Sequence, residues 1–572
     1  MTRIRRLYVY GICAVSLLFF ATGIENLIRL LLQTLAGAEA TQWLWLSQGQ
    51  FRQQISFFVA LTLIDGPVWI GHWLIANRAS ADDERASQLR RFYLYAVMAG
   101  ALIFFVPGLI GLIRIPLWAL LGAFRTQSML SALGAPVGLL AVTVPIWAYH
   151  RRLARSEAAA AGDEGGLATI RRLYYYLAAF GTVTFLLIDE ARLGTSVWEG
   201  VPRQISSLTL GGENWARAAL PSYAVAVLVF LVAWWWHFAQ TELVAGGSDD
   251  QARLERRSLL RRLYMYGLVL VCIVVGVINA STVLDDLLRA LLGSPDPTGS
   301  GRGLLDAVGQ PLVWGLVYGA FWLYQRSWLQ RESSRAAEAA EQASLRRLYY
   351  YLVAAVGLSV AAYGIILLSS TMLSLLSLTP DQPSLDWFRD RVSLGATLTL
   401  IGGALWFGHW HHQQSLVSDP LVAGAERAAL WRRLYLYAAC FVTVVAILVD
   451  AASVLYRLLL LALGDRSAPS LIETIRTPLS VILVGGVILA YHWRLLRFDQ
   501  RGEVARESSS QPSHVVVVLQ SADQATLDPL LAQFATLASD QVKVSILRGS
   551  QLDRQVKHQL SAWRDQSDRT EK

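Results

Sequence analysis

The sequence predicts an all-α polytopic membrane protein of six tandem transmembrane helical hairpins, about 12 spans, followed by a small C-terminal α/β (βαβα) domain. The 572-residue chain is 54% hydrophobic and only 16% charged, with a mean hydropathy of +0.41, whereas soluble domains are about a quarter charged. Its apolar runs are about 20 residues long, which is the length that crosses a bilayer. One short string recurs six times at a nearly constant interval, and such periodicity indicates a repeat architecture.

The recurring string opens each apolar run and reads RRLYYY at Arg171–Tyr176 and Arg346–Tyr351, with close variants elsewhere. A second string, Trp-x-x-His, follows each copy about 60 residues later, an interval that fits two spans and a turn. Each unit is therefore expected to be a hairpin that starts and ends on one side of the membrane. The six first tyrosines are Tyr8, Tyr93, Tyr174, Tyr264, Tyr349 and Tyr435, and the closing residues are His72, His150, His237, Gln325, His409 and His492.

The repeat period sets the domain boundaries. A polar linker follows the last hairpin and precedes a segment of different composition. The predicted hairpins cover residues 1–89, 90–170, 171–260, 261–345, 346–431 and 432–497, the linker covers 498–512, and the small cytoplasmic α/β domain covers 513–572.

The recurring polar residues are expected to anchor the hairpins at one membrane interface. Tyrosine and tryptophan place an apolar ring in hydrocarbon and a polar edge at the headgroups, and arginine raises its guanidinium to the phosphates. The predicted interfacial anchors are Arg6, Tyr8, Arg91, Tyr93, Arg172, Tyr174, Arg262, Tyr264, Arg347, Tyr349, Arg433, Tyr435, His72, His150, His237, His409 and His492.

The distribution of basic residues predicts the orientation. The anchored side holds about twice as many Lys and Arg residues as the turn side, and positive residues collect in the cytoplasm. We therefore expect a multi-pass protein of the cell (inner or plasma) membrane with cytoplasmic N- and C-termini. The first apolar run begins with a copy of the repeat and is too long for a signal peptide, so we expect it to be retained.

The tail is expected to be an interaction module. The segments 514–520 and 542–547 are predicted strands, each followed by a predicted helix, and no glycine-rich phosphate loop follows the first strand. A cytosolic protein is the expected partner of this domain.

The net charge of +8 indicates anionic lipid at the inner face rather than nucleic acid. No cofactor is expected, because the three single cysteines, Cys13, Cys272 and Cys440, give no pattern for a disulfide framework, zinc or covalent haem. No catalytic motif is visible, so we do not expect an enzyme.

The repeated histidines have two interpretations. They could ligate haem or a metal, or they could form an interfacial belt with the tryptophans. The belt is favoured because the histidine repeats with the unit and is replaced by Gln325 in the fourth copy.

Acidic residues in the spans offer another candidate site. Asp65 lies seven residues before His72, and no other unit has an acid at that position. Because a buried carboxylate costs about 2.5–3.5 kcal/mol in a membrane, Asp65 is the candidate intramembrane functional acid. A further set could form a cation or proton path or could lie near the outer headgroups beside arginines such as Arg192. This set is Glu25, Asp189, Glu190 and Asp450.

Three prolines distinguish the even units. Pro136, Pro311 and Pro478 each lie 14 residues before the closing residue of units two, four and six. They suggest that the units pair as odd with even, and they could start helices or kink them to open a cavity.

The opening string RRLYxY and the closing string PxWxxHW, complete at Pro67–Trp73, resemble a bacterial membrane domain family of unknown function that occurs as tandem two-helix hairpins. The resemblance covers Arg5 to Arg494 and not the tail; unit four lacks the histidine and unit six lacks the first tryptophan. It implies no substrate and no catalytic residue.

Together these observations favour an uncharacterised integral membrane repeat protein that acts as a non-catalytic membrane scaffold or sensor with cytoplasmic interaction surfaces. The alternative is a solute or ion transporter or channel that uses Asp65, and the third hypothesis is a haem-binding membrane protein.

Overall fold

A computed structural model describes residues 3–36, 48–78, 81–123, 126–206, 213–294, 303–335, 340–376, 384–419, 422–463 and 471–509. The chain divides into two units, Met1–Asp499 and Gln500–Lys572. The strands predicted at 514–520 and 542–547 lie outside the described residues. No strand occurs among the residues that are described, so the structure gives the predicted α/β domain no support.

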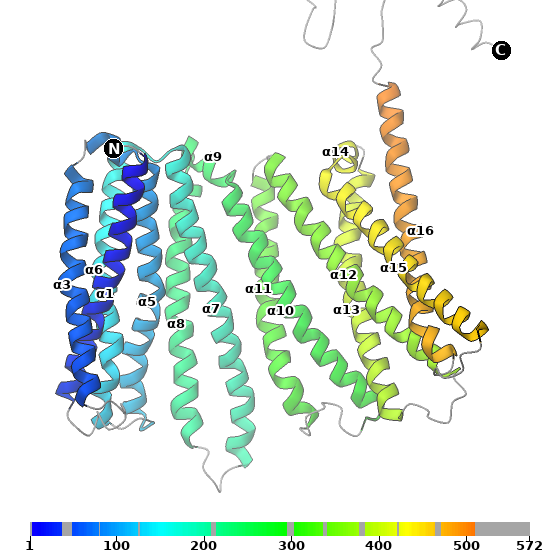
Figure 1. Ribbon diagram of the computed structural model, residues 1–572, viewed down its shortest axis with the longest axis horizontal. Coiled ribbons are helices and arrows are strands. Elements are labelled where there is room, and N and C mark those ends of the chain that lie inside the picture. The colour runs from blue at the N-terminus through cyan, green and yellow to red at the C-terminus, as the bar shows by residue number, and fades with distance from the viewer. Residues whose placement is uncertain are drawn as a thin grey trace, which may run out of the picture. The chain divides into compact units, whose positions relative to one another are not determined.

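The first unit is a row of helical hairpins (Figure 1). In chain order the two long helices of each hairpin are α1 (Arg3–Leu35) and α3 (Gln48–Arg78), α5 (Gln88–Leu120) and α6 (Thr126–Ala161), α7 (Gly165–Ser206) and α8 (Glu213–Ala245), α10 (Leu259–Leu291) and α11 (Leu304–Arg335), α12 (Ala340–Ser374) and α13 (Leu385–Ser418), and α15 (Leu430–Ala462) and α16 (Leu471–Ser509).

Three short helices connect odd hairpins to the even hairpins that follow them: α4 (Ala81–Arg85), α9 (Asp250–Arg256) and α14 (Ala423–Arg427). Figure 1 shows α9 and α14 at the same end of the helices as the N-terminus. We call this end, where each hairpin starts and finishes, the anchored end. The same-side hairpins predicted from the repeat are thus present in the described chain.

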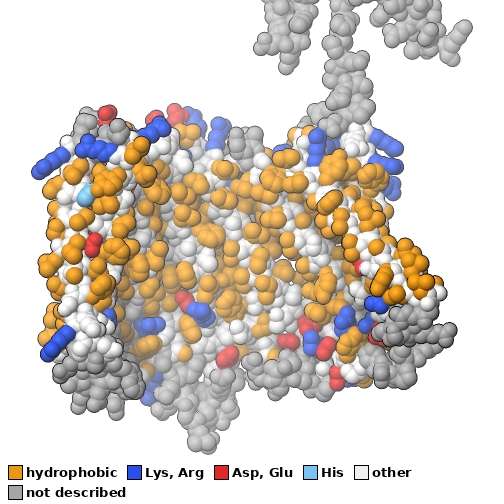
Figure 2. Space-filling view, viewed as in Figure 1, with side chains coloured by type: hydrophobic (Ala, Val, Ile, Leu, Met, Phe, Trp, Pro, Cys, Tyr) orange, Lys and Arg blue, Asp and Glu red, His pale blue; other side chains and the backbone are white. Residues whose placement is uncertain are grey.

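Ten of the described helices are long and apolar enough to cross a membrane, which supports a multi-pass membrane protein. The two long helices that fall outside this set are α7 and α11. In α7 the apolar run is interrupted by Asp189, Glu190 and Arg192. Figure 2 shows apolar side chains covering the middle of the helices along their length and charged side chains gathered towards the two ends of the helices.

The hairpins interlock in a regular way. The first helix of each hairpin packs against the next hairpin: α1 contacts α5 and α6, α5 contacts α7 and α8, α7 contacts α10 and α11, and α10 contacts α12 and α13. Because the first helix of a hairpin contacts both its own second helix and the next hairpin, the anchored ends of neighbouring hairpins lie side by side.

Small residues allow the closest approach within the fifth hairpin. A Cβ atom at Gly364 would lie 2.5 Å from the backbone nitrogen of Thr399, and one at Gly402 would lie 2.5 Å from that of Ala361. Only glycine permits such backbone contact, which is a common way to pack helices where lipid removes the hydrophobic driving force.

The three even-unit prolines lie inside α6, α11 and α16 and not in their first turns. This excludes the helix-start interpretation. Inside a helix, each proline removes one backbone hydrogen bond.

Candidate functional site

A chain of hydrogen bonds joins neighbouring hairpins at the anchored end. Between the second and third hairpins the indole nitrogen of Trp147 donates to the hydroxyl of Tyr174 over 3.0 Å, and that hydroxyl lies 3.2 Å from Nε2 of His237. The other ring nitrogen of His237 lies 2.7 Å from the carbonyl oxygen of Ala233. A carbonyl can only accept, so Nδ1 carries the proton and Nε2 accepts from the tyrosine. With this tautomer every group in the series of hydrogen bonds has a partner.

The complete arrangement recurs at Trp406, Tyr435 and His492, and parts of it recur at the other joints. The indole-to-hydroxyl distances are 3.4 Å for Trp69–Tyr93, 3.0 Å for Trp234–Tyr264 and 3.1 Å for Trp406–Tyr435, and the hydroxyl-to-imidazole distance is 3.2 Å for Tyr349–His409 and Tyr435–His492. We call the first tyrosine of each repeat, with its tryptophan and histidine partners, the aromatic seam.

The two ends of the row lack one partner each. Tyr8 has no preceding hairpin and is 60% exposed, while Tyr93 and Tyr174 are buried. In the last hairpin Leu489 stands where other hairpins carry the donating tryptophan, and no further hairpin follows in the described unit.

A second polar layer binds each odd hairpin to the short helix that follows it. Glu255 on α9 is fully buried and accepts hydrogen bonds from Arg171 at 3.1 Å, Arg172 at 2.8 Å and Tyr176 at 3.0 Å. Glu84 on α4 receives Arg6 and Tyr10, and Glu426 on α14 receives Arg346 and Arg347, at 2.9–3.1 Å. We call Glu84, Glu255 and Glu426 the pair glutamates.

Each even hairpin completes this layer with its own acid. Arg261 is buried and donates to Glu332 on α11 over 3.0 Å, and its Nη1 also reaches the Tyr176 hydroxyl at 3.5 Å. The equivalent pairs are Arg90–Glu157 at 2.8 Å and Arg432–Asp499 at 2.7 Å. Arginine, tyrosine and glutamate thus connect an odd hairpin to the next even hairpin through one buried network.

Two of the pair glutamates, Glu84 and Glu426, have a lowered pKa in this network. Burial raises the pKa of Glu426, but the hydrogen bonds and charges of Arg347 and Arg346 outweigh it, so that the pKa lies below its usual value. The pKa of Glu84 is likewise lowered, because hydrogen bonding to Arg6 outweighs burial. Charge-assisted hydrogen bonds are about twice as strong as neutral ones, so these acids make strong polar links between the odd hairpins and the short helices.

A family model described as Domain of unknown function (DUF5671) matches residues 6–140, 191–316 and 347–487. The chain belongs to the DUF5671 family. No curated protein and no solved structure matches the chain.

The three DUF5671 matches have similar boundaries relative to the hairpins. Each begins in an odd hairpin and ends in the second helix of the next even hairpin. The matches agree with the odd-even pairing that the prolines suggest, since each match covers parts of two hairpins and contains one pair glutamate.

The predicted anchors all lie on the helices at the anchored end, but most of them face protein. Arg91, Tyr93 and His150 have at most 3% of their surface exposed. A side chain packed between hairpins cannot reach a lipid headgroup, so for these positions the structure indicates coupling of hairpins instead. The other buried members are Tyr174, Arg262, Tyr264, Tyr349, Tyr435, His237 and His492; Arg6, His72, Arg172, Arg347 and His409 are half-buried, and Tyr8 and Arg433 are exposed.

Asp65 lies apart from this network. Its side chain is half-buried on α3, and among the described residues the carboxylate has no hydrogen bond or ion pair. Asp189, by contrast, lies 3.4 Å from the guanidinium of Arg192, as expected for an acid paired at the far headgroup region. Within the described residues no cluster of histidine, cysteine and acidic side chains could hold a metal ion.

The acids of the network were missed by the sequence reasoning, although a signal exists. Glu84, Glu255 and Glu426 each precede the first arginine of the following even hairpin by six residues, and Glu157, Glu332 and Asp499 each follow the closing His or Gln by seven. An alignment of pairs instead of single hairpins makes both spacings visible.

Proposed function

We propose that this DUF5671 protein is a non-catalytic membrane scaffold or sensor, placed in the cell membrane with both termini in the cytoplasm. The observation that carries the proposal is that the repeated arginine, tyrosine, tryptophan, histidine and glutamate side chains are engaged with one another. They link hairpins into pairs and pairs into a row. Residues used in this way fix the spacing of helices and leave few free groups for chemistry.

Anionic lipid and a cytosolic protein are the proposed partners, and nucleic acid is not. Exposed arginines such as Arg3 and Arg433 stand at the anchored end, where anionic headgroups would attract them by about 1 kcal/mol each. The segment 513–572 would recruit the protein partner.

Affinity purification of the full chain and of a chain ending at Arg501 tests the scaffold function. A chain in which an unrelated soluble domain of similar size replaces the tail serves as the control. We expect cytosolic proteins to be captured by the full chain and lost from both altered chains. Identical sets of proteins from all three would contradict the proposal.

Transport through Asp65 is the alternative, favoured by its half-buried carboxylate without a partner among the described residues. An isolated carboxylate at this depth is costly, and cation or proton transfer would be a reason to keep it. Solute flux into proteoliposomes is compared between wild type, Asp65→Asn and the control Asp386→Asn, which alters an exposed acid outside the candidate set. Loss of flux in Asp65→Asn alone would favour the transporter over the scaffold.

Haem binding is the third hypothesis, and the aromatic seam argues against it. In His237, His409 and His492 one ring nitrogen contacts a carbonyl oxygen and the other a tyrosine hydroxyl. Ligation would break a hydrogen bond at each of these three histidines. A Soret band in the purified full chain would overturn this argument.

A further inference from the structure

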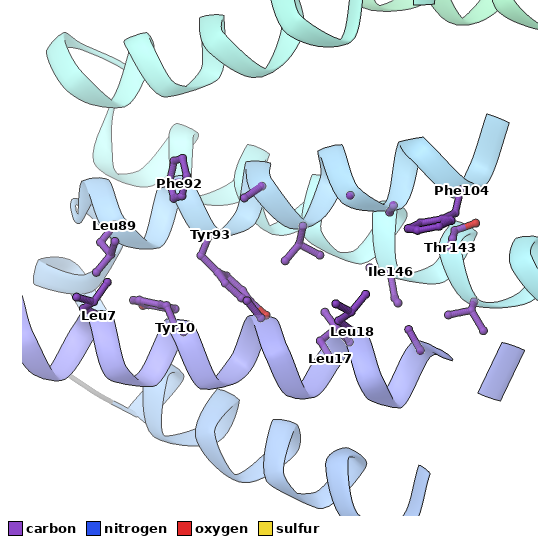
Figure 3. Close-up of a pocket in the computed structure, with 18 residues that line it drawn as sticks. Leu7, Tyr10, Leu17, Leu18, Leu89, Phe92, Tyr93, Phe104, Thr143 and Ile146 are labelled. Atoms are coloured by element: carbon purple, nitrogen blue, oxygen red, sulfur yellow. The ribbon is translucent and has the colours of Figure 1, made fainter. Parts of the chain in front are cut away.

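An open apolar groove lies between α1, α5 and α6 in the first hairpin pair (Figure 3), with a volume of about 390 Å³. Tyr10 and Tyr93 are buried at its base near the anchored end. Leu18 and Phe104 form part of its wall and are 54% and 48% exposed. The groove therefore opens at the surface of the membrane-spanning helices instead of being enclosed by them.

Two glycines create this groove. No atom lies within 4 Å of the place where a Cβ would stand at Gly11 on α1 or at Gly100 on α5. Counted from the first tyrosine of each repeat, the positions equivalent to Gly11 are Leu177 and Leu352, and those equivalent to Gly100 are Val271 and Val442. The second and third pairs thus carry branched side chains where the first pair leaves space.

The position of the groove relates it to the membrane. Its lining on α1 runs from Leu7 to Ala21, which is about 21 Å of helix. Exposed Arg3 precedes Leu7 by one helical turn, so the groove starts near the arginine-bearing anchored end. From there it extends beyond the depth of one leaflet, since the hydrocarbon core is about 30 Å thick.

We propose that the groove binds one acyl chain of an anionic phospholipid, whose headgroup lies at the arginine-bearing end. Water would gain few hydrogen bonds from the apolar lining, and an empty groove would lose dispersion contacts on its walls. A lipid acyl chain from the surrounding bilayer needs no hydrogen bonds and restores the dispersion contacts of the walls. The positive charge at the mouth of the groove selects an anionic headgroup. This lipid site goes beyond the scaffold function and does not depend on it.

The test is photolabelling of the full chain in phosphatidylcholine vesicles that contain a minor fraction of phosphatidylglycerol with a diazirine in the acyl chain. We expect label on α1 and α5. In the double variant Gly11→Leu/Gly100→Val, which uses the residue types of the other pairs, that label should fall about tenfold, because losing the contacts of only two methylene groups already accounts for this factor. A phosphatidylcholine probe with the same chain should label these helices more weakly.

The matched control is Gly71→Leu. Gly71 is exposed on α3, has no atom within 4 Å of its Cβ position and does not line the groove, so its label should equal that of wild type. Thermal unfolding checks that all variants are folded. Equal labelling of the double variant and wild type would overturn the site, and equal labelling by the two probes would overturn the anionic preference. Recovery of a tightly bound neutral isoprenoid from the groove would overturn the phospholipid as occupant.

Discussion

The joints within hairpin pairs and the joint between the second and third hairpins use the same residue types in different ways. Within the second pair, Glu255 is fully buried and receives three hydrogen bonds at 2.8–3.1 Å. Between the second and third hairpins the acid is Asp163, whose side chain is 18% exposed. Asp163 binds Arg171 at 2.5 Å but lies 3.8 Å from Arg91.

The difference follows from one methylene group and one short helix. Aspartate has a shorter side chain than glutamate, and no helix like α9 carries Asp163 into the network. As a result the guanidinium nitrogens of Arg91 have no hydrogen bond among the described residues, although the side chain is fully buried. The polar contacts of Glu255 are therefore more complete than those of Asp163, so we expect the two joints to differ in stability.

Breaking a pair glutamate should have the largest effect on stability. Glu255→Gln removes the charge that compensates Arg171 and Arg172, and breaking a buried ion pair costs about 3–5 kcal/mol. Asp163→Asn removes a more exposed acid, whose distance from Arg91 is 3.8 Å, and should cost less. The free energies of unfolding are measured by titrating the detergent-solubilised chain with a denaturing detergent. Equal losses for the two variants would remove the distinction between the joints.

Acidification should weaken the joints within pairs. The loss of stability should be smaller than in Glu255→Gln, because a protonated carboxyl still makes one hydrogen bond. The pKa values of Glu84 and Glu426 are lowered by their arginine partners. Their stabilising contribution is thus fully present above the unfolded value of about 4.3 and is lost as the pH falls through the lower folded value. The unfolding midpoint of the solubilised chain should drop below about pH 4, and Glu426→Gln should reduce that drop. A pH-independent midpoint in this range would contradict the role of these acids.

Hairpin number and direction could be predicted from the sequence because they depend on local patterns. A run of apolar residues and a six-fold string are visible without any partner residue, and the described helices follow them. The burial of Tyr93 and His150 could not be predicted in this way. A ring that suits the headgroup region also suits a contact between helices, and only the packing of α5 and α6 against their neighbours distinguishes the two.

The acids of the network show a second limit. Glu255 lies in a polar linker, and in sequence it resembles any solvated charge. Its burial results from three donors that come from α7, 79 to 84 residues away. Asp65, by contrast, was noticed because it is unique, yet it takes no part in the contacts that repeat. Uniqueness in a sequence and participation in a network are separate properties.

Removing a hydrogen bond of the aromatic seam should cost the same stability at a joint between pairs as at a joint within a pair. Trp147→Phe, at the joint between pairs, and Trp406→Phe, within the third pair, each remove an indole donor at 3.0–3.1 Å from a tyrosine hydroxyl. The hydroxyl keeps its contact with the histidine, so each variant should lose about 1 kcal/mol. The same denaturing-detergent titration measures both values. A Trp147→Phe loss well below that of Trp406→Phe would mean that the seam, too, differs between the two joints.

The smallest effect is expected where the row ends. Leu489→Trp restores the donor that the other hairpins carry, but the sixth hairpin has no described successor whose tyrosine could accept the bond. A partly exposed substitution without a partner changes stability by at most about 0.5 kcal/mol. If a tryptophan at this position were enough to form the seam, Leu489→Trp would stabilise the chain by the same 1 kcal/mol that Trp406→Phe removes. A gain of that size would show that another hairpin covers α16. An unchanged free energy of unfolding, together with an unchanged mass of the solubilised particle, would place the end of the row at the sixth hairpin, because the seam then requires both the donor and a following first tyrosine.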